Sequence, residues 1–146
     1  MERVTILRRA AELIRERKFL LSALLIIECG KNRAEAIGEV EEGADLIDEY
    51  CRQVEDSQGF EREMGSIDPR EHNKSILRPF GVWAVLAPFN FPHALSTGMS
   101  TGAMVAGNTV VFKPASATPL AGYEMARCFV DAGIPAGVVN FITGSG

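Results

Sequence analysis

The sequence contains no apolar run that reaches the roughly 18 residues a membrane-spanning helix requires. Its most apolar stretch, residues 19–27, is too short and lies inside an amphipathic pattern. The first 18 residues carry charges of both signs and no apolar core, so they do not resemble a secretory signal peptide. We therefore expect a protein that makes no use of a membrane and is located in the cytoplasm.

Cysteine and histidine are also scarce. The three cysteines, Cys29, Cys51 and Cys128, are odd in number and widely spaced, which argues against a disulfide framework and fits a reducing compartment. Each lies in or near a predicted helix rather than at a strand end, so we expect structural thiols. Neither His72 nor His93 has a cysteine or carboxylate at metal-ligand spacing, and the sequence therefore predicts no metal site.

The chain lacks an excess of basic residues, and its net charge is −4. A nucleic-acid-binding domain needs a basic face, so we expect no nucleic-acid partner. The chain has 146 residues, of which 47% are hydrophobic and 23% are charged, as is typical of one globular domain. No flexible linker, internal repeat or low-complexity tract divides it, so residues 1–146 are expected to form a single unit.

The first 56 residues show the apolar spacing of two long amphipathic helices. Gly30 is the expected C-cap of the first helix, and Asn32 is the expected N-cap of the second. Lys18 is the one polar interruption of the first stripe. The apolar positions are Val4, Leu7, Ala11, Ile14, Leu21 and Leu25 in the first helix and Ile37, Val40, Ala44, Ile47, Cys51 and Val54 in the second.

The second half of the sequence alternates between strand-like and helix-like segments. A loop is predicted over residues 56–73, where glycine, serine and proline interrupt the periodicity. The pattern then predicts strand-forming residues over 75–86, with a turn at 79–81 inside that segment, and strands at 109–112 and 138–142. Helices are predicted at 94–106 and 120–132 between them. Short apolar strands joined by helices indicate right-handed crossovers and a parallel sheet. The expected fold class is α/β, with two N-terminal helices before a partial Rossmann-like βαβαβ unit.

Polar and glycine residues follow each of these strands, at residues 88–92, 113–116 and 144–146. In an open α/β sheet, ligands bind outside the carboxyl ends of the strands. The sequence therefore predicts a ligand site formed by these three segments.

Four motifs resemble the NAD(P)-dependent aldehyde dehydrogenase superfamily. They are "ECGK" at 28–31, "APFNFP" at 87–92, "GNTVVFKPAS" at 107–116 and "AGIPAGVVNFITGSG" at 132–146. The resemblance covers nearly the whole chain, and within the superfamily it favours the bacterial 1-pyrroline-5-carboxylate (glutamate semialdehyde) dehydrogenase type. It implies the N-terminal part of a cofactor-binding domain in a truncated aldehyde dehydrogenase fold.

Asn90 lies between two phenylalanines just beyond a predicted strand. From the residues alone, it could satisfy local backbone groups at a strand end or act in chemistry. The resemblance implies that its side-chain amide donates to the oxyanion of a thiohemiacetal. Removal of one such donor typically costs about 3–4 kcal/mol of transition-state stabilisation.

The resemblance also implies a binding site for NAD or NADP. Lys113 corresponds to the family's lysine that binds the adenosine ribose, although a strand-end lysine could equally be a solvated charge. Ser116 stands where a glutamate is common, and its neutral side chain would not repel the extra phosphate of NADP. The remaining expected cofactor contacts are Leu86, Ala87, Pro88, Phe89, Ala115 and Gly146, the last in the weak Gly-Ser-Gly motif.

The family's nucleophilic cysteine and general-base glutamate lie downstream of the glycine turn, and no residue of this sequence matches either. The resemblance therefore implies a fragment that is inactive alone, while the intact, homo-oligomeric enzyme would oxidise a small aldehyde to an acid through a thiohemiacetal. A second interpretation stays open, in which the chain is a non-catalytic binding or assembly module that keeps the fold.

Two expectations follow for surfaces. Residues 66–78 are expected to belong to the family's oligomerisation hairpin, with a partner strand from outside this sequence. A sheet with so few strands and helices is also expected to expose an apolar face, which would favour association or poor solubility.

Overall fold

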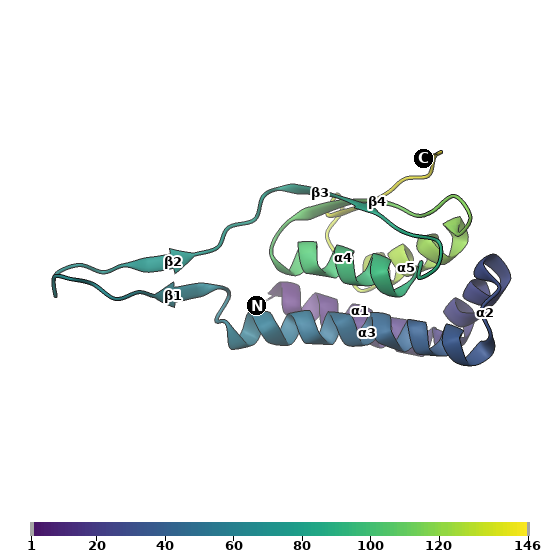
Figure 1. The fold of residues 1–146 in the computed structure, drawn as a ribbon, viewed down its shortest axis with the longest axis horizontal. Helices are drawn as coiled ribbons and strands as arrows, with labels where there is room; N and C mark the ends of the chain where they lie inside the picture. The colour runs from purple at the N-terminus through teal and green to yellow at the C-terminus, as the bar shows by residue number, and fades with distance from the viewer. Residues whose placement is uncertain (1, 146) are drawn as a thin grey trace.

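The computed structural model describes residues 2–145, and three helices form its amino-terminal part (Figure 1). They are α1 (Glu2–Glu16), α2 (Lys18–Cys29) and α3 (Arg33–Asp56). The prediction of one continuous first helix was wrong at Arg17, whose φ of −97° and ψ of 9° separate α1 from α2. Arg17 also forms an ion pair of 2.7 Å with Asp131, which lies in a distant part of the chain.

Both predicted caps between α2 and α3 are confirmed. Gly30 has a left-handed φ of 71°, and its N–H donates to the carbonyl of Ile26 at 3.0 Å. The Asn32 side chain accepts a hydrogen bond of 2.9 Å from the N–H of Glu35. These caps end one helix and begin the next within three residues, which forces a sharp corner.

The predicted parallel βαβαβ unit is confirmed, and with it the α/β fold class. Strand β3 runs parallel to β4, and β4 runs parallel to β5, so that β4 is central. The elements in chain order are β3 (Val82–Leu86), α4 (Ala94–Val105), β4 (Thr109–Lys113), α5 (Pro119–Asp131) and β5 (Val139–Phe141).

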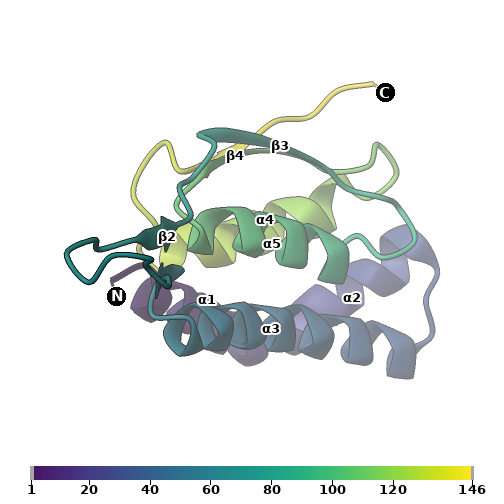
Figure 2. The ribbon, with the colours of Figure 1, turned by 60° about the vertical axis from the view of Figure 1, so that its left-hand side comes forward.

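The elements form three layers, with α4 and α5 between the sheet and the layer of α1 and α3 (Figures 1 and 2). The central strand turns Val110 and Phe112, both 0% exposed, toward these helices. Figure 2 shows no helix over the opposite face of the sheet within the described residues. Val82 and Leu86 are exposed there, at 72% and 69%, so the sheet presents the apolar surface that the sequence predicts.

A hairpin projects from the body beyond the end of α3 (Figure 1). It pairs β1 (Glu61–Glu63) with β2 (Lys74–Ile76) in antiparallel register. The predicted loop over 56–73 thus contains a strand, β1, which pairs with β2. The expectation of a partner strand from outside the sequence stays a prediction. All six strand residues are exposed. None of the helices in residues 2–145 has the length and apolar character needed to cross a membrane.

Helices α3 and α4 approach closely where Gly43 faces His93. A Cβ on Gly43 would lie 2.7 Å from Nδ1 of His93, whereas a Cβ on Gly38 of the same helix would meet nothing within 4 Å. His93 is 1% exposed, and neither ring nitrogen has a hydrogen-bond partner among residues 2–145. This burial lowers the pKa of His93 from 6.5 to about 4, so the ring is neutral near pH 7.

We expect opposite effects from alanine at the two glycines of α3. Gly38→Ala should raise the free energy of unfolding by up to about 1 kcal/mol, because alanine favours an open helix position. Gly43→Ala should lower it by about 1–3 kcal/mol, because the new methyl group displaces the buried His93 ring. Urea denaturation followed by circular dichroism measures both values. Equal stabilisation by the two substitutions would show that α3 and α4 do not meet at Gly43.

His93 should make stability depend on pH. The unfolded chain binds a proton at this ring below about pH 6.5, and the folded chain binds it only near pH 4. Stability conferred by the neutral ring is therefore complete above pH 6.5 and falls by up to roughly 3 kcal/mol as the pH drops toward 4. Urea denaturation at several pH values should show this slope, and His93→Leu should flatten it over the same interval. An unchanged slope in His93→Leu would contradict the assignment.

Candidate functional site

The carboxyl ends of the three parallel strands meet at one edge of the sheet. Leu86 is the register partner of Lys113, and the N–H of Ala87 donates to the Lys113 carbonyl at 3.1 Å. Ser116 donates from its hydroxyl to the Gly144 carbonyl at 3.2 Å. The structure thus brings together the loop after β3, the turn after β4 and the segment after β5, which are the three predicted ligand segments.

The turn after β4 is fixed by packing against α5. Lys113 is half-buried, and its ammonium lies 3.4 Å from the Pro114 carbonyl, a long contact and its only hydrogen bond within residues 2–145. Pro114 is buried against Gly122, where a Cβ would come within 2.7 Å of the proline ring. The carbonyl of Ala115, which is half-buried, accepts from the N–H of Thr118 at 3.0 Å. Lys113 thus ends the central strand β4, which is paired with β3 on one side and with β5 on the other.

The loop after β3 carries the other candidate residues. Leu86, the last residue of β3, and Phe89 are exposed, whereas Ala87 and Pro88 are half-buried. Asn90 is exposed in this loop, between the end of β3 and the start of α4. Gly146, a further predicted cofactor contact, lies outside the described residues. An exposed amide beyond a strand end is accessible to a ligand, and its role remains a prediction.

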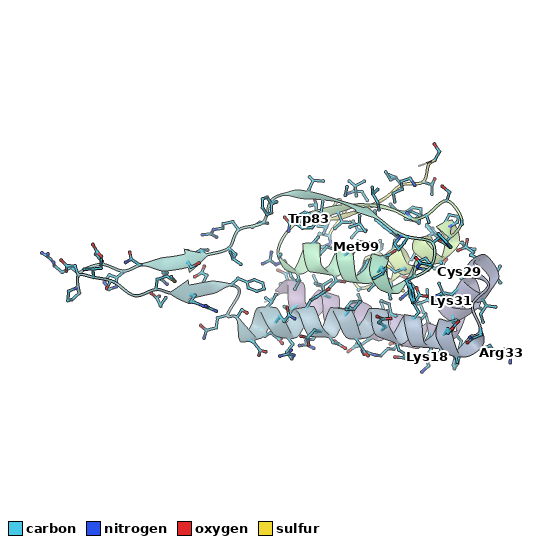
Figure 3. The ribbon with its side chains drawn as sticks, viewed as in Figure 1. Lys18, Cys29, Lys31, Arg33, Trp83 and Met99 are labelled. Atoms are coloured by element: carbon cyan, nitrogen blue, oxygen red, sulfur yellow. The ribbon has the colours of Figure 1, made fainter. Side chains whose placement is uncertain are left out.

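The chain beyond Asn90 is bound to the corner between α2 and α3. The ammonium of Lys31 lies 3.9 Å from the centre of the Phe91 ring. One carboxylate oxygen of Glu39 accepts from the N–H groups of His93 and Ala94, at 2.8 and 3.2 Å. Its other oxygen lies 2.5 Å from the Lys31 ammonium. Figure 3 shows Lys31 at this corner, at the end of the molecule where α4 begins.

A second glutamate binds the start of α5. The two carboxylate oxygens of Glu28 accept from the N–H groups of Leu120 and Ala121, at 3.0 and 2.8 Å. Glu28 and Lys31 are the first and last residues of the "ECGK" motif. Glu28 thus binds the start of α5, and Lys31 contacts Phe91 in the segment before α4 and Glu39 of α3. Sequence reasoning missed Glu39, although it shares the buried face of α3 with Ala36 and Gly43, and a glutamate on such a face is a signal of a specific partner.

The three cysteines have the properties of structural thiols. Cys51 and Cys128 are fully buried, and burial raises the pKa of each to about 11. Burial also raises the pKa of the half-buried Cys29. A thiol with a raised pKa is protonated near pH 7 and is a poor nucleophile. Within residues 2–145, no three side chains of histidine, cysteine or carboxylate type are grouped as a metal site requires.

Comparison with known proteins bears on the whole chain. The model of the aldehyde dehydrogenase family matches residues 1–146. The 1-pyrroline-5-carboxylate dehydrogenase of Anoxybacillus flavithermus is 43% identical over 145 residues, which are 99% of this chain and 28% of that protein. The corresponding enzyme of Geobacillus is 42% identical over 147 residues, again 28% of its length. The chain thus spans less than a third of these relatives.

Solved structures agree. A 1-pyrroline-5-carboxylate dehydrogenase from Thermus, described with bound NAD, superposes with a TM-score of 0.94 at 41% identity, over 99% of this chain and 28% of that one. A bifunctional proline utilization A protein superposes with a TM-score of 0.92 at 36% identity, over 98% of this chain and 15% of that one. With its parallel βαβαβ unit and a family match that extends over every residue, the chain belongs to the aldehyde dehydrogenase family.

Proposed function

We propose that these residues form the amino-terminal part of an NAD(P)-dependent aldehyde dehydrogenase that oxidises an aldehyde to a carboxylic acid through a thiohemiacetal. The observation that carries the proposal is the exposed Asn90 in the loop after β3, whose first residue is hydrogen-bonded to Lys113 at the carboxyl edge of the sheet. Relatives named 1-pyrroline-5-carboxylate dehydrogenase support glutamate semialdehyde as the substrate. The complete enzyme would be a cytoplasmic homo-oligomer, with the hairpin of β1 and β2 as one of its contacts.

The proposed role of Asn90 follows from charge. When a thiolate adds to an aldehyde, the carbonyl oxygen becomes negative, and a fixed N–H donor stabilises it. The amide of Asn90 is neutral and donates without losing a proton, so it serves at any pH at which the thiolate exists. None of the three thiols of this chain, all with raised pKa values, suits the nucleophile's role. We propose that the nucleophile and the general base come from residues outside the 146.

Two features of this edge support a dinucleotide site. Within residues 2–145, Lys113 makes one long hydrogen bond and keeps donors for a ligand, and the neutral Ser116 follows it in the turn after β4. We propose that Lys113 binds ribose hydroxyls and that Leu86, Ala87, Pro88, Phe89 and Ala115 line the bound cofactor. The nicotinamide, when bound, accepts a hydride from the substrate carbon. The residues of this chain orient the nicotinamide and exclude water from its binding site.

The central test is Asn90→Ala in the complete protein that carries these residues. We expect kcat for glutamate semialdehyde to fall by about 100- to 1,000-fold with little change in KM, because the amide acts only on the oxyanion. Gln53→Ala is the control, since Gln53 carries an exposed side-chain amide on α3. Steady-state NADH formation measures both. Wild-type kcat in Asn90→Ala would overturn the oxyanion role, and a complete protein without turnover would favour a binding module.

Cofactor choice gives a second test. Because Ser116 carries no charge, the complete protein should bind NAD and NADP with dissociation constants that differ by less than about a hundredfold. Ser116→Glu should weaken NADP binding by roughly tenfold or more while it leaves NAD binding nearly unchanged, because the carboxylate repels the extra phosphate. Isothermal titration calorimetry measures both constants. Equal effects on the two cofactors would place Ser116 away from the ribose.

A further inference from the structure

The segment between Asn90 and α4 is held mainly by contacts to distant residues. Phe91 is 44% exposed, so burial of its ring does not fix it. His93 occupies the N-cap position of α4, yet within the described chain its side chain makes no capping hydrogen bond. Local hydrogen bonds also contribute: the Ser96 hydroxyl donates to the Pro92 carbonyl, and the N–H of Leu95 donates to the Phe91 carbonyl at 3.4 Å. The position of Asn90 therefore depends on what the α2–α3 corner supplies.

That corner supplies one connected set of charges. The Lys31 ammonium lies 2.5 Å from Glu39 and 3.9 Å from the Phe91 ring centre, so it joins a carboxylate to an aromatic face. The side chains of Lys31 and Glu39 are only 12% and 1% exposed. Water screens such a pair weakly, and each partner restricts the orientation of the other. The ion pair is thus a rigid support.

The ion pair of Lys31 and Glu39 contacts residues at both ends of the turn that leads into α4. Lys31 holds Phe91, the residue directly after Asn90, and Glu39 holds the N–H groups of His93 and Ala94. An oxyanion donor must lie within about 0.5 Å of its productive place, and a 1 Å displacement can cost about a hundredfold in rate. A support next to the donor therefore acts on catalysis.

We propose that Lys31, paired with Glu39, is a positioning residue that sets the place of the Asn90 amide through the Phe91 ring. The inference rests on the proposed oxyanion role of Asn90. It assigns the "GK" end of the first motif to the active site, although Lys31 belongs to neither the loop nor the sheet edge.

The chain contains a second lysine–phenylalanine pair, Lys18 and Phe19, that serves as a control because we expect it to have no effect on kcat. Lys18 also has a carboxylate partner, Glu41 at 3.1 Å, and a neighbouring phenylalanine, Phe19, whose ring centre is 5.7 Å away. Lys18 is 36% exposed, and Phe19 is 72% exposed. Substitutions of Lys18 and Phe19 therefore reproduce the chemistry of those at Lys31 and Phe91 on a solvated surface.

The test compares variants of the complete protein. Phe91→Leu removes the ring that Lys31 covers and leaves the buried ion pair intact, so it should fold even if Lys31→Met does not. We expect Phe91→Leu and Lys31→Met to lower kcat by about tenfold to a hundredfold, with KM changed less than about threefold. Lys31→Arg should restore most of kcat, because guanidinium also pairs with carboxylates and stacks on rings. Lys18→Met and Phe19→Leu should keep wild-type kcat.

A double-mutant cycle separates this inference from the proposed function. In the Asn90→Ala background, Phe91→Leu should change kcat by less than about twofold, because the amide it positions is already gone. A full, additive loss in that background would show that Phe91 acts on stability or another group, and wild-type kcat in Phe91→Leu would also overturn the positioning role. If Asn90→Ala alone keeps wild-type kcat, the oxyanion assignment has failed, and the positioning role falls with it.

Discussion

The arrangement of this chain depends on two buried or half-buried glutamates that cap helices far from them in the sequence. Both crossover helices begin without a side-chain cap from their own N-cap residues within 2–145. Glu39 accepts from two N–H groups at the start of α4, and Glu28 from two at the start of α5. A carboxylate there satisfies unpaired donors and interacts favourably with the helix dipole. The helical layer and the sheet are therefore joined at the end where the loops of the sheet gather.

This joining explains why α4 is rich in small residues. It lies between the sheet and α3, so both of its faces are covered (Figure 2). There is no space for a methyl group between Gly43 of α3 and the buried His93. Ser96 and Thr97 of α4 are fully buried. Close approach of α3 and α4 brings Glu39 within reach of the α4 N-terminus. The close packing of α3 against α4 and the capping of α4 by Glu39 therefore depend on each other.

Sequence periodicity predicted the sheet, its crossovers and both caps at the α2–α3 corner, because those features follow from local spacing and from Gly30 and Asn32. It did not predict the break at Arg17, whose partner Asp131 lies in another helix. It also missed β1, since three exposed residues carry no burial pattern. The strand-end rule placed Lys113 and Ser116 at one edge. The links of Lys31 and Glu39 to the Asn90 loop remained hidden, because they join residues distant in sequence.

The loop that carries Asn90 is held at its two ends by different kinds of interaction. At its start, the N–H of Ala87 bonds to the Lys113 carbonyl, which ties the loop to the strand that ends at the predicted ribose site. At its end, the Phe91 ring lies on Lys31, and Glu39 holds the first turn of α4. The hydrogen bond joins the loop to the sheet edge, and the contact between Lys31 and the Phe91 ring joins it to the α2–α3 corner. An exposed amide between two such anchors can face a ligand and still lose little entropy when it binds one.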